Sequence, residues 1–265
     1  MKHITSSQNP LIKTIKALRS QAKSRRESGQ TILEGIHLAE SYLDNNFVPM
    51  LCVTNESAQV NPEVERILDR CDALGVKYVS ITDDQFNAIS SVEQGIGLLF
   101  IVTMPKVEDL PPVTQGALLL DTIQDPANVG AMLRTAAAAG VHDVYCSSGT
   151  ASVWSPKVLR VGMGAHFSLN IYENVDLVRV ITESNIPVRA TTIDAKTTLY
   201  ETDLSEPCAW LMGNEGQGVS KALLELNVDT LTIPQSENVE SLNVAAATAV
   251  CLFEQRRQKI LLTKR

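Results

Sequence analysis

The chain has few of the features that mark secreted, membrane or metal-binding proteins. Its 265 residues include only five cysteines, which are widely scattered and form no Cys-x-x-Cys pair, so neither a disulfide framework nor a thiolate metal site is expected. No apolar run approaches the roughly 18 residues that a membrane-spanning helix needs. The first residues also lack the apolar segment of a signal peptide. We therefore expect a cytoplasmic protein with reduced cysteines and no metal.

Histidine and dinucleotide-binding patterns are also missing. Four histidines occur, and none has partners at the spacing of a hydrolase triad or a zinc site. His166 stands beside apolar residues and is expected to pack in the core. The glycines at 213, 216 and 218 have the order Gly-x-x-Gly-x-Gly, whereas a dinucleotide fingerprint needs Gly-x-Gly-x-x-Gly after a first strand. This order argues against a nicotinamide-dependent oxidoreductase.

Charge is unevenly distributed along the chain. The net charge is −7, yet residues 1–37 hold seven basic and two acidic residues, a net +5 that leaves −12 for the rest. A basic N-terminal segment on an acidic chain indicates an anionic polymer bound through one end, although the same cations can form only a solvated helix face. The residues expected to contact nucleic acid here are Lys13, Lys16, Arg19, Arg25 and Arg26.

Helical and strand patterns alternate along the whole chain, with one break at a proline-rich stretch. We expect a small α/β domain over residues 1–104, a linker over 105–113 and a second α/β domain over 114–265. In the first domain, strands are expected at 31–33, 47–53, 77–81 and 97–102. One helix is expected to begin at residue 10, a second to follow the strand at 31–33 and end at about residue 45, and two more to span 62–74 and 83–89. A polar loop is expected at 24–29. In the second, strands are expected at 117–120, 143–146, 168–172, 188–192, 209–212 and 229–233, and helices at 128–139, 155–164, 175–184 and 242–261. This spacing predicts a parallel sheet covered on both faces.

A glycine-rich loop with a single carboxylate follows the expected strand at 209–212. Residues 210–220 read Trp-Leu-Met-Gly-Asn-Glu-Gly-Gln-Gly-Val-Ser. Glycines at a strand end let the backbone approach a ligand closely, although they also serve as simple turn residues. Glu215 suits a purely structural tight turn poorly unless a basic group faces it. The pattern favours a ligand-binding loop at the carboxyl end of the sheet.

Three further stretches carry polar side chains near strand ends or helix starts. Residues 121–136 leave a strand through a polar loop and enter an alanine-rich helix. Asn128 stands where the N-cap of that helix is expected, and Arg134 follows as either a functional or an ordinary surface arginine. Lys157 and Arg160, near another helix start, suit phosphate oxygens or are mere surface charges. The third stretch runs from Ile233-Pro234 through an acidic, amide-rich loop to Glu240-Ser-Leu-Asn243.

Together, three segments resemble the motifs of the SpoU/TrmH family, which are SPOUT-class RNA ribose 2′-O-methyltransferases. They are Asn128-x-Gly-x-x-x-Arg134-Thr, Leu211-Met-Gly-Asn-Glu-Gly-Gln-Gly218 and Ile233-Pro-x-x-x-x-x-Glu240-Ser-Leu-Asn-Val-Ala245, in the family's order across residues 117–254. Residues 1–102 resemble the ribosomal-protein-like substrate-binding domain that precedes many such enzymes.

The resemblance implies a cofactor, a fold and an assembly. S-adenosylmethionine would donate the methyl group, bound in a deep trefoil knot at the carboxyl end of the parallel sheet. The cofactor-binding residues would be Gly213, Asn214, Gly218, Ile233, Leu242 and Asn243. The protein would be a homodimer, with the final helix and the first-motif helix at the interface.

The resemblance also assigns catalytic roles. Arg134 would activate the ribose hydroxyl, and because a guanidinium stays protonated, we expect it to clamp the adjacent phosphate and stabilise oxyanion charge rather than act as a simple base. Glu215 would orient Arg134, Asn128 would fix Arg134 or the ribose, and Ser241 and Asn243 would complete the polar wall. Ribosomal RNA of the 23S type is the favoured substrate. Transfer RNA and a non-catalytic RNA-binding or ribosome-assembly role are the alternatives.

Overall fold

The computed structural model describes residues 2–92, 95–106, 109–236 and 241–263. The chain forms two compact units, called here the first unit (Met1–Lys106 with Trp154–Phe167) and the second unit (Val107–Val153 with Ser168–Arg265). The expected linker at 105–113 includes residues 107 and 108, which lie outside the described residues. No helix within the described residues is long and apolar enough to cross a membrane.

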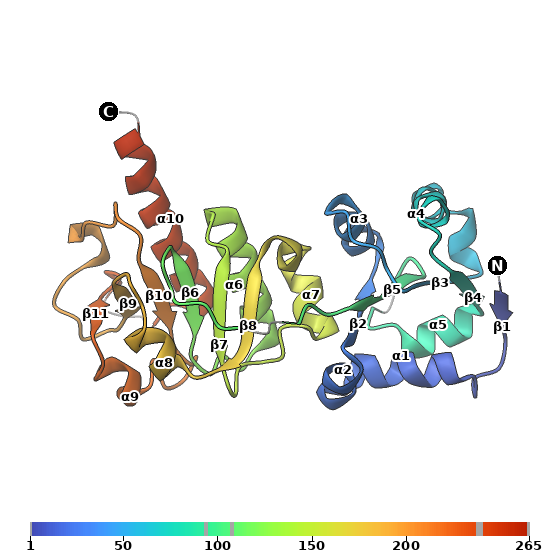
Figure 1. Ribbon diagram of the computed structural model, residues 1–265, viewed down its shortest axis with the longest axis horizontal. Helices are drawn as coiled ribbons and strands as arrows, with labels where there is room; N and C mark the ends of the chain where they lie inside the picture. Colours follow the sequence, from blue (N-terminus) through green and yellow to red (C-terminus); the bar gives the residue numbers. More distant parts are fainter. Residues whose placement is uncertain (1, 93–94, 107–108, 237–240, 264–265) are drawn as a thin grey trace. The chain divides into compact units, whose positions relative to one another are not determined.

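The first unit contains a mixed five-stranded sheet with the strand order β1-β4-β3-β5-β2 (Figure 1). The strands are β1 (Lys2–Ile4), β2 (Gln30–Glu34), β3 (Leu51–Asn55), β4 (Tyr78–Ile81) and β5 (Leu98–Thr103). β5 runs antiparallel to both β2 and β3, and the other pairs are parallel. The helices are α1 (Pro10–Ser20), α2 (Ala22–Ser28), α3 (Ile36–Asp44), α4 (Pro62–Ala73), α5 (Asp83–Ile89) and α7 (Pro156–Gly162).

Helix α1 follows directly from its sequence. Asn9 caps it, because its side chain accepts a hydrogen bond from the Leu11 backbone N–H at 2.9 Å, and Pro10 occupies the first turn. The apolar residues at helical spacing, Ile12, Ile15 and Leu18, are buried in one core cluster with side chains of α5 and the sheet. The intervening lysines stay exposed. The predicted helix start is therefore confirmed.

The expected polar loop at 24–29 is wrong, because residues 22–28 form helix α2. This helix has no apolar stripe from which it could be predicted, and it ends at Gly29, whose φ of 66° lies in the left-handed region. Arg25 is only 5% exposed, and its Nη1 donates to the Leu18 carbonyl at 2.8 Å. Arg25 therefore satisfies the C-terminal end of α1, and its expected contact with RNA is not supported.

The segment Trp154–Phe167 belongs to the first unit, although it lies within the domain expected at 114–265. Helix α7 packs against β2, and the Thr31 hydroxyl donates to the Trp154 carbonyl at 2.7 Å. The ring of His166, which is buried as expected, lies 5.3 Å from that of Trp154. The division at residues 105–113 stays a prediction.

The described residues of the second unit form a six-stranded sheet in which all pairs are parallel, with the order β11-β9-β10-β6-β7-β8 (Figure 1). The strands are β6 (Ala117–Leu120), β7 (Asp143–Ser147), β8 (Asn170–Val175), β9 (Val188–Thr191), β10 (Ala209–Met212) and β11 (Val228–Leu231). The helices are α6 (Pro126–Ala139), α8 (Leu177–Thr182), α9 (Lys221–Leu224) and α10 (Val244–Thr263). The predicted parallel α/β fold is confirmed, and the knot stays a prediction from the resemblance.

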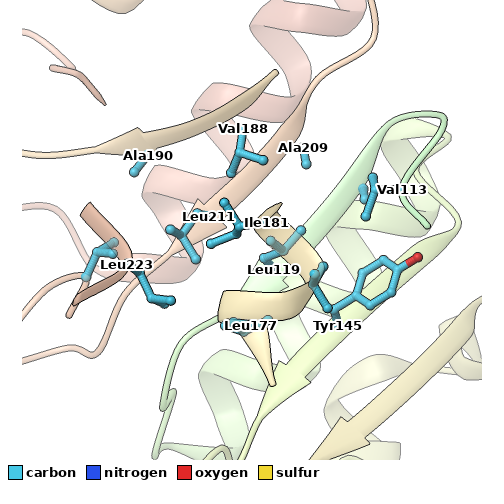
Figure 2. Close-up of a cluster of buried hydrophobic side chains, with 13 residues drawn as sticks. Val113, Leu119, Tyr145, Leu177, Ile181, Val188, Ala190, Ala209, Leu211 and Leu223 are labelled. Carbon is cyan, nitrogen blue, oxygen red and sulfur yellow. The ribbon is translucent and has the colours of Figure 1, made fainter. Parts of the chain in front are cut away.

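Side chains on both faces of this sheet are buried, as its apolar strands require. One face packs against α8 and α9 in the cluster of Figure 2, which includes Leu119, Tyr145, Leu177, Ile181, Val188, Leu211 and Leu223. Successive side chains on a strand point to opposite faces, so Leu118 and Trp210 belong to the other face. Helix α10 packs against β10 and also against α6. Backbone pairing of β6 with β10 sets the register of the two strands.

A buried amide joins α10 to β10. Gln255 is 3% exposed, and its Oε1 accepts a hydrogen bond from the Trp210 indole N–H at 3.0 Å. Its Nε2 donates to the Glu206 carbonyl at 3.1 Å and to the Cys208 sulfur at 3.2 Å. The amide therefore satisfies the one polar atom of the largest fully buried side chain in the described residues.

We predict that Gln255→Leu lowers the free energy of unfolding by about 1–3 kcal/mol, because the buried indole N–H loses its acceptor. Urea denaturation followed by tryptophan fluorescence measures the change. Gln235→Leu, at an exposed position of the same unit, is the matched control and is expected to change stability by less than about 0.5 kcal/mol. Equal effects of the two substitutions would contradict the prediction.

Candidate functional site at the carboxyl edge of the parallel sheet

Two loops meet where β6 and β10 end. The two strands are parallel neighbours, and Leu120 pairs with Met212 at their last residues. The backbone N–H of Asp121 then donates to the Met212 carbonyl at 2.9 Å. Because carboxyl ends of adjacent parallel strands share one edge, the loop after β6 (residues 121–125) lies beside the loop after β10 (residues 213–220).

The loop at 213–220 folds back on itself. The Gly218 N–H donates to the Asn214 carbonyl at 2.9 Å, and the Asn214 Oδ1 accepts from the Gly216 N–H at 2.9 Å and the Gln217 N–H at 3.1 Å. A side chain at Gly213 would overlap the backbone of residues 218 and 219. Gly213 is therefore required by the fold of the loop itself, whereas we expected the glycines to serve ligand approach.

Glu215 is the acceptor that joins this loop to the start of α6. Its Oε2 accepts from the Gln124 backbone N–H at 3.2 Å, and its Oε1 accepts from the Asp125 backbone N–H at 3.1 Å. The same Oε1 accepts from the Asn128 side-chain Nδ2 at 3.0 Å. One carboxylate thus binds two backbone amides and one side-chain amide of the first-motif segment.

These contacts set the protonation of Glu215. Burial, the largest single influence, raises the pKa of this carboxyl group, but hydrogen bonds from Asn128 and from backbone amides together outweigh burial and hold the pKa below its usual value. Glu215 is therefore ionised at neutral pH. Its contribution to the folded site is present above the usual glutamate pKa and is lost as the pH falls through the lowered value.

Asn128 is the second member of the network, and its expected role as N-cap is wrong. Asp125 caps α6, since its Oδ1 accepts from the Ala127 N–H at 2.8 Å and Pro126 follows it. Asp-Pro is the signal that could have located this cap, as Asn9-Pro10 did for α1. Asn128 lies one turn inside the helix, so its side chain is available to bind other segments.

Asn243 is the third member and brings in the start of α10. Its Nδ2 donates to the Asn128 Oδ1 at 2.9 Å. Its own Oδ1 accepts from the backbone N–H groups of Ala245 at 2.9 Å and Ala246 at 3.2 Å, which caps α10. The chain of hydrogen bonds from Glu215 through Asn128 to Asn243 therefore ties together all three motif segments. We call it the Glu215–Asn128–Asn243 network.

Two of the expected catalytic residues lie outside this network. The Arg134 side chain is exposed and makes no hydrogen bond or ion pair with any described residue. It lies six residues beyond Asn128, about 9 Å along the helix axis. The expected pairing of Glu215 with Arg134 is not found, because Glu215 binds other groups. Ser241 is exposed and also makes no hydrogen bond within the described part of the chain, and Glu240 lies outside it.

The remaining expected cofactor residues provide apolar and open surface at the same edge. Asn214 donates through Nδ2 to the Thr122 carbonyl at 2.9 Å, which fixes the loop. Gly218 has a φ of 70° and no atom within 4 Å of the place where a Cβ would stand. Ile233 is buried, and Leu242 is 37% exposed. Backbone polar groups, open space and an exposed leucine fit a nucleoside, which has a flat apolar ring and hydroxyl groups.

The residues expected to contact RNA belong to the first unit. Lys13, Lys16 and Arg26 are exposed, and Arg19 is half-buried. Lys157 is exposed, whereas the Arg160 Nη1 donates to the Ser91 carbonyl at 3.2 Å. Exposed lysines on α1 remain available to an anionic ligand. Among the described residues, no group of three or more His, Cys, Asp or Glu side chains is placed to hold a metal ion.

Comparison with known proteins identifies both parts of the chain. Residues 115–253 match the SpoU rRNA Methylase family, and residues 9–99 match the MRM3-like substrate binding domain. An uncharacterized tRNA/rRNA methyltransferase of Synechocystis sp. is 36% identical over 261 residues, which cover 97% of this chain and 94% of the relative. The 23S rRNA guanosine 2′-O-methyltransferase RlmP of Bacillus subtilis is 31% identical, covering 97% and 100%.

A solved structure agrees with this relationship. The S-adenosylmethionine-bound rRNA methyltransferase from Sinorhizobium meliloti has a TM-score of 0.83 and 29% sequence identity, with 97% of each chain covered. The match to the family covers more than half of this chain and includes every member of the Glu215–Asn128–Asn243 network. The chain therefore belongs to the SpoU rRNA methylase family and is an S-adenosylmethionine-dependent RNA methyltransferase.

Proposed function

We propose that the protein methylates a ribose 2′-hydroxyl of ribosomal RNA of the 23S type. The observation that carries the proposal is the Glu215–Asn128–Asn243 network, which joins the three motif segments by side-chain hydrogen bonds at one sheet edge. The choice of substrate is supported by RlmP, which is similar over the full length of both chains and is named for 2′-O-methylation of 23S rRNA.

S-adenosylmethionine is proposed to bind at the carboxyl edge of the second unit. Backbone groups of Gly213, Asn214 and Gly218 would face its nucleoside part, with Ile233 and Leu242 as the apolar side of the site. Asn243 would border the site through its cap on α10. When bound, the cofactor would supply an electrophilic methyl group carried on a positively charged sulfur. The ribose oxygen that receives this methyl group would lose its proton to solvent.

Arg134 is proposed to act on the RNA. Its guanidinium is exposed and makes no hydrogen bond or ion pair with the described residues, so its donors are available to a phosphate. Because it stays protonated at neutral pH, it would clamp the phosphate beside the target ribose and stabilise negative charge that develops on the attacking oxygen. Glu215, Asn128 and Asn243 would hold the surrounding backbone in place, and the free hydroxyl of Ser241 would bind the ribose.

RNA is the partner, and we propose that the first unit supplies much of the affinity. Lys13, Lys16 and Arg26 are exposed on α1 and α2 and suit phosphate oxygens. Arg19, Lys157 and Arg160 are secondary candidates. The acidic remainder of the chain supports the assignment of the affinity to this basic segment. A ribosomal substrate also implies a cytoplasmic location.

A homodimer formed through α6 and α10 is also proposed. Helix α10 exposes several large apolar side chains, including Phe253, Ile260 and Leu261, and exposed apolar side chains on one helix suit a protein interface. Sedimentation equilibrium at micromolar concentration tests the assembly. A mass of about twice the 28.9 kDa of the chain is expected, and a mass of one chain would contradict the dimer.

The reaction is tested with labelled S-adenosylmethionine and total RNA from a strain that lacks the gene. Label in a large ribosomal RNA, at one alkali-resistant dinucleotide, is the expected result, because 2′-O-methylation blocks alkaline cleavage at that position. Label in transfer RNA would keep the chemistry and overturn the substrate. Failure to bind the cofactor would overturn the enzymatic function altogether.

Arg134→Ala is expected to reduce kcat by about 10²–10³-fold or more, the loss that follows removal of one oxyanion-stabilising donor. Its affinity for S-adenosylmethionine should stay within about threefold, since the Arg134 side chain makes no hydrogen bond or ion pair with the described residues of the cofactor loops. Arg134→Lys should recover only part of the rate, because an ammonium lacks the planar fork. Arg179→Ala, at an exposed arginine of the same unit, is the control. Substantial turnover by Arg134→Ala would remove this residue from the chemistry.

Lys13→Ala/Lys16→Ala is expected to weaken RNA binding and to reduce the slope of log affinity against log salt by about one for each lysine. Fluorescence anisotropy of a labelled RNA fragment measures both quantities when the salt concentration is varied from about 50 to about 200 mM. Lys77→Ala removes an exposed lysine from a different part of the first unit and should change neither. An equal loss in the control would show that the binding is not localised to α1.

A further inference from the structure

A second carboxylate lies beneath the glycine-rich loop and has no role so far. Asp121 directly follows β6 and is only 5% exposed. Its Oδ2 accepts a hydrogen bond from the Ser220 backbone N–H at 2.8 Å. Burial of a carboxyl group is unfavourable unless its oxygens are hydrogen-bonded, so this contact satisfies a group that would otherwise destabilise the fold.

The contact closes the far end of the 213–220 loop. Ser220 is its last residue and precedes helix α9, with a φ of −62° and a ψ of 141°. Its side chain makes no capping hydrogen bond, so the backbone N–H is the group through which Ser220 binds the end of β6. The near end of the loop is held one residue further along, where the Asn214 side chain donates to the Thr122 carbonyl at 2.9 Å.

Residues 121 and 122 therefore hold both ends of the loop. Thr122 has a φ of 54°, a left-handed conformation that is uncommon for threonine, and its own N–H donates to the Ser147 hydroxyl at 2.9 Å on the neighbouring strand. The backbone at this strand end is thus fixed independently of the loop. Asp121 and Thr122 form a rigid base for the loop. The loop conformation is further restricted because Gly213 packs closely against the backbone of residues 218 and 219.

We propose that Asp121 is a positioning residue for the S-adenosylmethionine site. By holding the Ser220 N–H, it fixes the Gly213–Ser220 loop in the conformation that receives the cofactor. The inference rests on the proposed cofactor site, which uses Gly213, Asn214 and Gly218 of that loop. Asp121 acts through the loop backbone and touches neither RNA nor the reacting atoms, so its loss changes cofactor affinity rather than the methyl-transfer step.

The test compares two ways of breaking one hydrogen bond. Asp121→Ala removes the acceptor, and Ser220→Pro removes the donor N–H at a φ that proline can adopt while placing a ring carbon against the Asp121 carboxylate. Calorimetric titration of each full-length variant with S-adenosylmethionine is expected to show about tenfold weaker binding, the effect of losing one buried hydrogen bond. The double variant should be no weaker than either single one, because both remove the same contact.

Two further variants separate positioning from general damage. Asp121→Asn keeps an acceptor oxygen and is expected to bind the cofactor within about threefold of the unchanged protein. Asp143→Ala removes a carboxylate from the opposite, amino-terminal edge of the same sheet and should leave the affinity unchanged. In steady-state assays, Asp121→Ala should raise KM for S-adenosylmethionine while kcat at saturating cofactor stays within a few-fold.

Wild-type affinity in folded Asp121→Ala and Ser220→Pro would overturn the proposal, as would a loss confined to kcat. If Asp121→Ala does not fold, as judged by circular dichroism, the cofactor affinities of Ser220→Pro and Asp121→Asn are compared instead. Equal affinities of these two variants would overturn the proposal. Failure of the unchanged protein to bind S-adenosylmethionine would instead overturn the proposed cofactor site, which keeps the two outcomes distinguishable.

Discussion

The site depends on one carboxylate that satisfies donors from another part of the chain. Glu215 stands in a turn, where a carboxylate is unfavourable unless something faces it, and the structure shows that what faces it is not a cation. Two backbone N–H groups before α6 and the Asn128 amide point at its oxygens. These N–H groups lie at the start of a helix, where donors have no partner within the helix and negative charge is favoured. The lowered pKa of Glu215 is the electrostatic result.

The same arrangement separates the residues that fix the protein backbone from the residues whose side chains are free to bind substrate. Glu215, Asn128 and Asn243 bind one another and the backbone, so their hydrogen-bonding groups are largely occupied within the protein. The side chains of Arg134 and Ser241 are exposed and make no hydrogen bond or ion pair with the described residues. A rigid network beside free polar groups is what transfer to a bound hydroxyl requires, because a preorganised site needs little rearrangement when charge develops. Asp121 adds a further contact that fixes the backbone, because it accepts a hydrogen bond from the last residue of the glycine-rich loop.

The sequence predicts those parts of the fold that local patterns determine. Strands β6 and β10 match their expected bounds, because short apolar runs bounded by turn residues leave little choice. Helix α2 was missed because its seven residues carry no apolar stripe. The site residues themselves were found through motifs, but their partners were not. Glu215 and Asn128 are 87 residues apart in sequence, and only the folded structure shows that they bind each other and that the Arg134 side chain lies outside the network.

The central claim, that one network holds the three motif segments as a unit, is tested most directly by a double-mutant cycle between its two ends. Within the described residues Glu215 and Asn243 share no hydrogen bond, and both bind the Asn128 side chain. The cofactor affinity of Glu215→Ala, Asn243→Ala and the double variant is measured by calorimetric titration. If the network acts as a unit, the losses in affinity do not add, and the interaction energy is at least about 1 kcal/mol. Losses that add to within about 0.5 kcal/mol, as for independent sites, would contradict it.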